Sequence, residues 1–220
     1  MAANVATANN GVNDNFRAPR GKLPDVATRP YHHGNLREEL LDRALDTVRD
    51  RGVAALSLRE VARDAGVSHA APRRHFPDRQ ALLDGLAQRG FERLRTTLEA
   101  AAGDGRGPYA ARLERVAQAY VAFAVRDAAL LELMFAAKKL DPDGPLHEAA
   151  EQAFAVMLEL LAEGRVDGEL AGAVDDAVAV LFPLLHGLAS LAGAGMLETD
   201  DLDATVATAL RGALTGLRPR

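Results

Sequence analysis

The sequence predicts an all-α protein. Its apolar residues are mainly Ala, Leu and Val, and only 7 Phe, 3 Tyr and no Trp occur among 220 residues. Ala and Leu are strong helix formers, and the apolar side chains recur at helical spacing rather than alternating as in strands. A hydrophobic content of 48% is enough for a core. We therefore expect about nine helices, with room for a small and a larger helical domain.

Local start and stop signals place these helices. Asn35, with Glu38 three residues on, caps the first one, which ends before Gly52. Asp78 opens a long helix and Gly103 closes it. Beyond the first, we expect helices at about 58–65, 69–75, 79–102, from Pro108 onward, and at about 128–138, 145–163, 174–195 and 202–217.

Residues 57–68 predict a short helix, a tight turn and the start of a second helix. Ser57 and Glu60 form a capping box at a helix start. Gly66 ends that helix, because glycine adopts the left-handed conformation without a clash of a Cβ atom. Val67 then returns to the core and Ser68 caps the next helix. This layout is typical of a helix-turn-helix, whose second helix enters the major groove of DNA.

The segment from about residue 35 to residue 83 resembles the DNA-binding domain of TetR-family transcriptional regulators. The residues that carry the similarity are Gly52, SLREVARDAGVS at 57–68, His75-Phe76 and Arg79. The resemblance implies an all-helical homodimer with a helix-turn-helix domain at 29–83 and a ligand-binding and dimerisation domain at 84–220. It also implies a repressor, not an enzyme, that a small molecule releases from a pseudo-palindromic operator.

The second half carries a weaker resemblance to the TetR branch named for its Trp-His-Gly motif. The similar segments are 120–135 and 181–191. His186-Gly187 match the motif, whereas Phe182 stands where that branch has tryptophan. The resemblance therefore supports a ligand-binding domain but implies no role for the tryptophan.

The family resemblance also implies which residues meet DNA. They are base-facing His69, Ala70, Ala71, Arg73 and Arg74, and the backbone-contacting residues Ser57, Arg59, Ser68, His75 and Arg79. Arg73 and Arg74 are the candidates for base discrimination, because the Arg fork fits guanine O6 and N7 or a phosphate. The alternative for these two arginines is a solvated basic face.

Two residues depart from the family pattern. Pro72 stands where many relatives have Leu, and Arg73 stands where they usually have Tyr. With Ser68 as the cap, Pro72 would be the fourth helical residue, where it lacks an N–H and crowds the Ser68 carbonyl. We expect an irregular first turn or a later helix start, and an altered operator preference.

The net charge of −5 is unevenly divided along the chain. Residues 29–95 carry 13 Lys/Arg and 10 Asp/Glu, whereas residues 96–220 carry 10 and 19. Affinity for DNA depends on local basic surface, since neutralising phosphates releases counterions. The basic balance of the first segment is therefore compatible with DNA binding, and the acidic segment should face away from DNA.

Residues 1–28 have no periodic apolar face, and we expect a disordered tail. Its basic residues are consistent with an arm that reaches phosphates or a minor groove, and the simpler alternative is a solvated tail without a role. The tail lacks the apolar stretch of a signal peptide, so we expect a cytoplasmic protein.

Several kinds of site are disfavoured by composition. The absence of Cys excludes disulfides, thiol redox sensing, Cys-based zinc sites and cysteine nucleophiles. His32, His33, His69 and His75 have no close carboxylate to complete a metal site. No nucleophile–base set or Gly-rich phosphate loop is found either, so we expect no metal, cofactor or catalysis.

Residues 177–197 contain no Asp, Glu, Lys or Arg, and this uncharged segment is long enough to span a membrane. Pro183, His186 and several small residues favour instead a buried helix at a dimer interface. A second apolar stripe, with Leu202 and Leu210, predicts a four-helix seam formed by helices 174–195 and 202–217 of two subunits.

The large adaptable side chains of the second domain are core or pocket candidates. As pocket residues we assign Tyr120, Phe123, Met134, Phe154, Met157, Phe182 and His186, with Phe135 as a further large side chain. Such a lining predicts an apolar or aromatic small ligand. The competing hypothesis for the whole chain is an all-α ligand carrier or small enzyme whose N-terminal domain no longer binds DNA.

Overall fold

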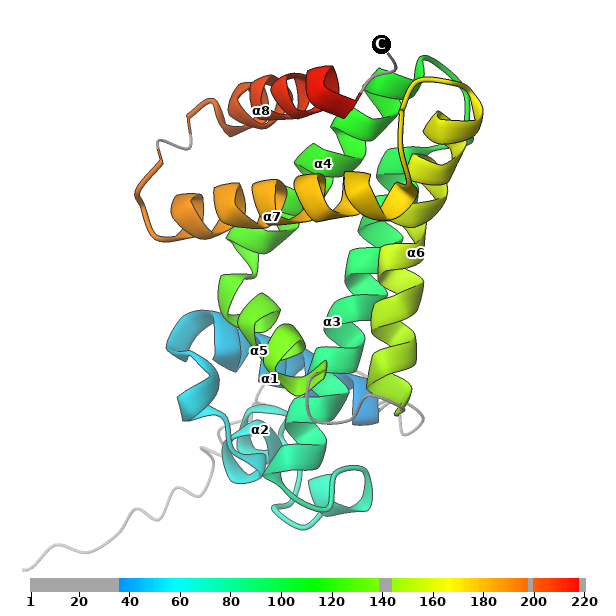
Figure 1. Ribbon diagram of the computed structural model, residues 1–220. Coiled ribbons are helices and arrows are strands. Elements are labelled where there is room, and N and C mark those ends of the chain that lie inside the picture. Colours follow the sequence, from blue (N-terminus) through cyan, green and yellow to red (C-terminus); the bar gives the residue numbers. More distant parts are fainter. Residues whose placement is uncertain (1–35, 139–143, 198–199, 218–220) are drawn as a thin grey trace, which may run out of the picture. The chain divides into compact units, whose positions relative to one another are not determined.

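The computed structural model describes residues 36–138, 144–197 and 200–217, and these residues form one compact unit. All regular structure in these ranges is helical, which confirms the predicted class (Figure 1). The elements are α1 (Leu36–Arg51), η1 (Val53–Ala55), α2 (Leu58–Asp64), η2 (Pro72–Arg74), α3 (Arg79–Ala102), α4 (Tyr109–Arg126), α5 (Ala128–Lys138), α6 (Pro145–Val166), α7 (Val174–Gly193) and α8 (Leu202–Leu217).

One predicted helix is wrong. Residues 69–75 form turns and the three-residue 3-10 helix η2 instead of an α-helix, so the described ranges hold eight α-helices. The Ser68 carbonyl accepts from the Ala71 N–H at 3.0 Å, and the Pro72 carbonyl accepts from the His75 N–H at 2.9 Å. Pro72 has no N–H to donate to the Ser68 carbonyl, so an α-helical bond cannot form there. Hydrogen bonds between residues three apart replace it.

The long helix α3 begins and ends where its caps predict. The Asp78 side chain accepts from the Ala81 N–H at 2.9 Å, and Gly103 follows the helix with a φ of 71°. The left-handed backbone at Gly103 favours glycine, because a Cβ atom would be strained there. The predicted cap at Asn35, the tail, His32 and His33 lie outside the described residues.

We call residues 36–83 the head. Its helices α1 and α2 pack with the start of α3 around a small core, to which Leu40, Val61 and Phe76 contribute fully or almost fully buried side chains. Arg79, the first residue of α3, donates from Nε to the Leu56 carbonyl at 2.9 Å. It also donates from Nη2 to the Val53 carbonyl at 2.8 Å. Arg79 thereby fastens the η1 turn to the start of α3.

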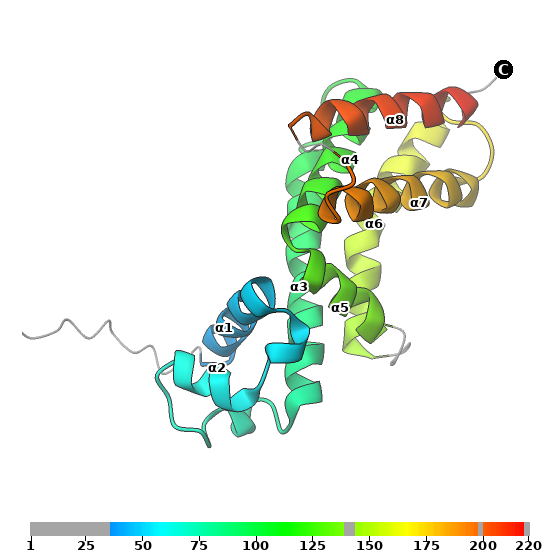
Figure 2. The same cartoon turned by 90° about the vertical axis from the view of Figure 1, so that its left-hand side faces the viewer.

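We call residues 84–217 the body. Figures 1 and 2 both show α3 and α6 running side by side, with α7 crossing α4 and α8 lying beyond α7. The α3 side chains Phe91, Leu94 and Leu98 are buried between these helices. At Gly90, α5 approaches so closely that a Cβ atom would lie 2.6 Å from Met134 Sδ. The glycine therefore allows α3 and α5 to pack tightly.

Head and body are joined by a buried carboxylate. Asp127, between α4 and α5, accepts from Arg49 Nε of α1 at 2.6 Å and from Arg126 Nε at 2.9 Å, and its side chain has no exposed surface. Burial alone would raise the pKa of Asp127, but the hydrogen bonds and charges of the two arginines outweigh it and hold the pKa below its ordinary value. Asp127 is therefore ionised at neutral pH.

Candidate DNA-reading surface and ligand pocket

We call residues 68–75 the reading segment. Pro72 is buried and anchors it, while Ala71 is half-buried. The other six residues are exposed, namely Ser68, His69, Ala70, Arg73, Arg74 and His75. The guanidinium groups of Arg73 and Arg74 have no ion pair or hydrogen bond with the described residues. Both cations are therefore available to an external anion.

The three other predicted contact residues differ in how free they are. The Ser57 hydroxyl accepts from the Glu60 N–H at 3.2 Å and donates to the Glu60 carboxylate at 3.4 Å, so it is engaged as a helix cap. Arg79 is engaged with the two carbonyls of the η1 turn. Arg59 is exposed and has no partner among the described residues.

Elsewhere in the head, arginines are neutralised internally. Arg51 pairs with Glu60 at 3.2 Å, and Arg63 pairs with Asp64 at 3.1 Å. Exposed pairs of this kind contribute little stability, but they cancel charge locally. The unpaired cations of α2 and the reading segment are consequently left as a basic surface on the head, where the sequence predicts the DNA contacts.

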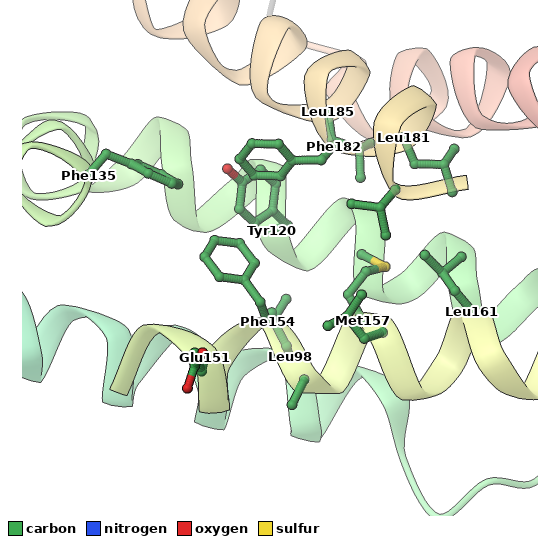
Figure 3. A pocket seen from close by; sticks show the side chains of 13 residues that line it. Leu98, Tyr120, Phe135, Glu151, Phe154, Met157, Leu161, Leu181, Phe182 and Leu185 are labelled. Atoms are coloured by element: carbon green, nitrogen blue, oxygen red, sulfur yellow. The ribbon is translucent and has the colours of Figure 1, made fainter. Parts of the chain in front are cut away.

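The body contains an apolar pocket of about 590 Å³ between α3, α4, α5, α6 and α7 (Figure 3). The residues that line it are Leu98, Tyr120, Phe135, Glu151, Phe154, Ala155, Met157, Leu158, Leu161, Val178, Leu181, Phe182 and Leu185. Pockets of this size and composition suit a small molecule whose surface is mostly apolar.

The predicted pocket residues fall into two groups. Tyr120, Phe154, Met157 and Phe182 line the pocket, as does Phe135. The remaining three do not. Phe123 and Met134 are fully buried in the core, and His186 contacts two lining residues, Tyr120 and Phe182.

Aromatic rings form most of one end of the pocket. Phe182 packs edge-on to Phe154 with centroids 5.7 Å apart, and it stacks on His186 at 5.6 Å. Tyr120 Oη and His186 Nδ1 are hydrogen-bonded at 2.9 Å, with the donor set by the imidazole tautomer. Burial raises the pKa of Tyr120, which keeps its hydroxyl protonated. This pair offers a polar contact beside an otherwise apolar surface.

Sequence reasoning missed several lining residues, chiefly aliphatic ones. Leu185 of α7 lies three positions after Phe182 and Leu158 of α6 lies four positions after Phe154, so each shares a helix face with a predicted residue; Leu181 in turn lies four positions before Leu185. This helical spacing is the feature of the sequence from which these lining residues could have been predicted. Glu151, at the pocket edge, pairs with His147 at 3.2 Å and is mostly exposed. Nothing in its sequence context distinguishes it from any solvated acid.

Two further expectations concern metals and membranes. The described residues contain no group of three or more His, Asp or Glu side chains placed to hold a metal ion. One described helix, α7, is long and apolar enough by length and composition to cross a membrane. Within the single chain, 28% of its apolar window is buried.

Comparison with protein families gives two matches. Residues 40–86 match the model described as bacterial regulatory proteins of the tetR family. Residues 113–213 match the model described as the tetracyclin repressor-like C-terminal domain. Together these matches cover more than half of the chain.

Solved structures of similar fold cover most of the chain. A protein of unknown function from Rhodococcus sp. RHA1 is 41% identical over 87% of this chain and 100% of its own, with a TM-score of 0.77. A TetR family transcription regulator from Marinobacter aquaeolei VT8 is 18% identical over 84% and 96%, with a TM-score of 0.66. The TetR family regulator PfmR from Thermus thermophilus is 17% identical over 82% and 99%, with a TM-score of 0.61. No curated protein matches this chain.

Proposed function

The chain belongs to the TetR family of bacterial regulatory proteins and is a DNA-binding transcriptional regulator; we propose that it is a repressor that a small molecule releases from a pseudo-palindromic operator. The observation that carries this proposal is the apolar pocket of about 590 Å³, which shares helix α3 with the head. Leu98, near the end of α3, lines the pocket, and Arg79, at its start, is fastened to the head. One helix thus runs from the head to the pocket.

Arg73 and Arg74 carry the DNA contact in this proposal. Their charges are exposed and unpaired among the described residues, and an Arg fork binds either a guanine edge or a phosphate. Arg59, His69 and His75 add backbone contacts from neighbouring exposed positions. Ala70 and Ala71, being small, let the backbone approach a base edge. Ser57, Ser68 and Arg79 then act mainly by holding the backbone of the head in shape.

The repressor acts as a homodimer through α7 and α8. The outer face of α7 presents Val180 and Leu191, which are 44% and 40% exposed, together with the small residue Gly187. A Cβ atom at Gly187 would meet nothing within 4 Å, so the space above it is open to a second subunit. A helix this apolar with 28% of its window buried is more stable when another helix pair covers it. Two recognition heads then match half-sites about 34–36 Å apart.

The ligand is a small apolar or aromatic molecule, and the protein is cytoplasmic and has no catalytic role. The ligand releases DNA by favouring a dimer geometry with a different head spacing, and only to the extent of its differential affinity for the two geometries. The rings of Phe154 and Phe182 would contact the ligand, and the Tyr120–His186 pair would accept or donate one hydrogen bond to it.

A titration of fluorescent DNA from upstream of the protein's own gene tests this proposal. Arg73→Ala and Arg74→Ala should each weaken binding by about 1–3 kcal/mol and lower the salt dependence by about one unit per lost phosphate contact. Arg106→Ala, which removes another exposed arginine from the α3–α4 loop, should leave both quantities unchanged. Failure of the unchanged protein to bind any genomic fragment would instead favour a ligand carrier with an inactive head.

A further inference from the structure

A second recess lies on α3, away from the apolar pocket. It is a shallow cleft of about 690 Å³ that runs along α3 and reaches the end of α4. The residues that line it are Arg89, Glu92, Arg93, Thr96, Thr97, Ala100 and Arg126. None of these lines the apolar pocket. Of its three arginines, Arg89 pairs with Glu38 and Asp42 and Arg126 pairs with Asp127, so Arg93 is the one without an ion pair among the described residues.

Arg93 is a half-buried cation whose guanidinium has no hydrogen bond or ion pair with the described residues. Burial, followed by the positive charge of Arg49, lowers the pKa of Arg93, and Arg126 and Arg89 add to that effect. Asp127 is the nearby carboxylate, and it is already shared by Arg49 and Arg126. A third cation is therefore held beside a carboxylate that two others already neutralise.

The neighbouring arginines Arg126 and Arg89 also have N–H groups without a hydrogen-bond acceptor among the described residues. Arg126 gives only its Nε to Asp127, which leaves its two Nη groups. Arg89 pairs through its Nη groups with Glu38 and Asp42, but its Nε is buried without a hydrogen-bond partner among the described residues. The Thr96 and Thr97 hydroxyls donate to carbonyls of their own helix, so the arginines supply the donors of this cleft.

We propose that this cleft binds a small phosphate-bearing anion, held by Arg93 and Arg126 with Arg89 at the side. A phosphate group carries about −1.5 to −2 charges at neutral pH, so it would pair with the unpaired charge of Arg93 and accept hydrogen bonds from the Nη groups of Arg126. Planar guanidinium groups bind such an anion through paired, charge-assisted hydrogen bonds. The anion is either free phosphate or the phosphoryl group of a larger metabolite. It acts at the joint of head and body, because Arg126 also holds Asp127.

The phosphates of DNA are a poorer match for this cleft. Arg93 lies fourteen residues beyond Arg79, which opens α3 in the head. Along an α-helix that separation is about 21 Å, well beyond the length of a side chain. Arg93 is also recessed between two helices, whereas the cations of the reading segment stand exposed. The position suits a small anion that enters a recess.

Thermal unfolding of the full chain in pyrophosphate, matched in ionic strength with chloride, tests the proposal. Pyrophosphate at ten times its Kd should raise the Tm of the unchanged protein by about 3–5 °C. Arg93→Gln should bind pyrophosphate about tenfold more weakly, as expected for the loss of a charged hydrogen bond. Arg93→Gln should also be more stable than the unchanged protein at low ionic strength without the anion, since it removes an unpaired charge beside two others.

Arg95→Gln is the matched control. Arg95 lies on the same helix two residues on, is outside the cleft, and bonds to Gln152 at 2.9 Å. It should respond to pyrophosphate like the unchanged protein. Free phosphate tested in the same way separates a single phosphate from a larger ligand. An equal pyrophosphate response in Arg93→Gln, or no response beyond chloride in the unchanged protein, overturns the proposal. So does a loss of DNA binding in Arg93→Gln that leaves the pyrophosphate response intact.

Discussion

The reading segment and the apolar pocket have opposite chemistry. The reading segment is a set of exposed side chains on irregular backbone, with two unpaired arginines, Arg73 and Arg74. The pocket is a hollow between packed helices, where Phe154 and Phe182 pack edge to face. One region presents charge to water and the other withdraws apolar surface from it. The reading segment precedes α3 along the chain, and Leu98 of α3 lines the pocket.

The side chains of the two regions differ in how much they contribute to the stability of the fold. Pocket rings are held by many contacts, and their removal would disturb packing as well as binding. The exposed arginines make no contact that supports the fold, and their replacement should alter DNA binding alone. Variants in the reading segment are therefore the cleaner test of function, and the joint at Asp127 is where the two regions can be coupled.

Salt should separate the two regions most strongly. If Arg73 and Arg74 of two subunits each neutralise a phosphate, raising monovalent salt from about 50 to 200 mM should weaken DNA binding on the order of 100-fold. Binding of a neutral apolar fluorophore, 1-N-phenylnaphthylamine, to the pocket should change less than about twofold, since no charge is neutralised. Parallel fluorescence titrations measure both. Equal salt dependence of the two affinities would contradict the contrast between a charged site and an apolar one.

Asp127→Asn tests whether the joint holds head and body together. Removing a buried charge partner costs about 3–5 kcal/mol, and the partial exposure of Arg49 and Arg126 reduces the expected loss of unfolding free energy to about 2 kcal/mol. Chemical denaturation at neutral pH measures it. Asp104→Asn, in the exposed α3–α4 loop, is the control and should be nearly neutral.

The same variant makes a prediction about pH. The folded pKa of Asp127 lies below its ordinary value of 3.8, so its ionised form stabilises the fold above that value. The stability difference between the unchanged protein and Asp127→Asn should be full near neutral pH. It should close as the pH falls through the folded pKa, because protonated aspartate and asparagine then resemble each other. A difference that does not change with pH would assign the loss to packing instead.

Tyr120→Phe tests the polar pair at the pocket. The change deletes the hydroxyl that bonds to His186 and leaves a half-buried nitrogen unpaired, which should cost about 1 kcal/mol. Affinity for the neutral fluorophore should stay the same. Tyr109→Phe is a matched control, because Tyr109 Oη is buried without a partner among the described residues, and its removal should be neutral or stabilising. Equal destabilisation of both variants would count against a role for the His186 bond.

Pro72→Ala should lower the free energy of unfolding by on the order of 1 kcal/mol, because lost contacts of the buried ring and the added freedom of the unfolded chain outweigh the gain of a helix-compatible N–H. The new N–H can bond to the Ser68 carbonyl, so Cα chemical shifts of residues 69–75 should become helical. Pro77→Ala, at an exposed position before the α3 cap, should leave those shifts unchanged. Shifts that stay irregular in Pro72→Ala would mean that tertiary contacts, and not the proline, shape the segment.

Much of the fold is predictable from the sequence because its helix ends are signalled locally. Asp78 and Gly103 bound α3, and Ser57 begins α2 through its bond to Glu60. The reading segment shows the limit of this approach. Pro72 is foreseeable as a disturbance, but family expectation favoured a helix there, and the hydrogen bonds that replace it depend on where the buried proline is anchored.

The sites are predictable only in part, because lining a pocket depends on how helices face each other. Residue type suggested large adaptable side chains, and Phe154 and Phe182 are among those that line the pocket. Met134 has the same chemistry but lies at the tight α3–α5 contact beside Gly90. The engagement of Arg79 with two carbonyls more than twenty residues away has no local signal at all.

The length of α3 turns small rotations into large displacements. Its 24 residues extend about 36 Å, so a tilt of about 5° at the pocket end moves the other end by about 3 Å. The rise of DNA is about 3.4 Å per base pair, so this displacement is close to one step of the duplex. In a symmetric dimer the two ends move in opposite directions. A ligand that tilts α3 by only this angle would put the two heads out of phase with their half-sites by nearly two base pairs.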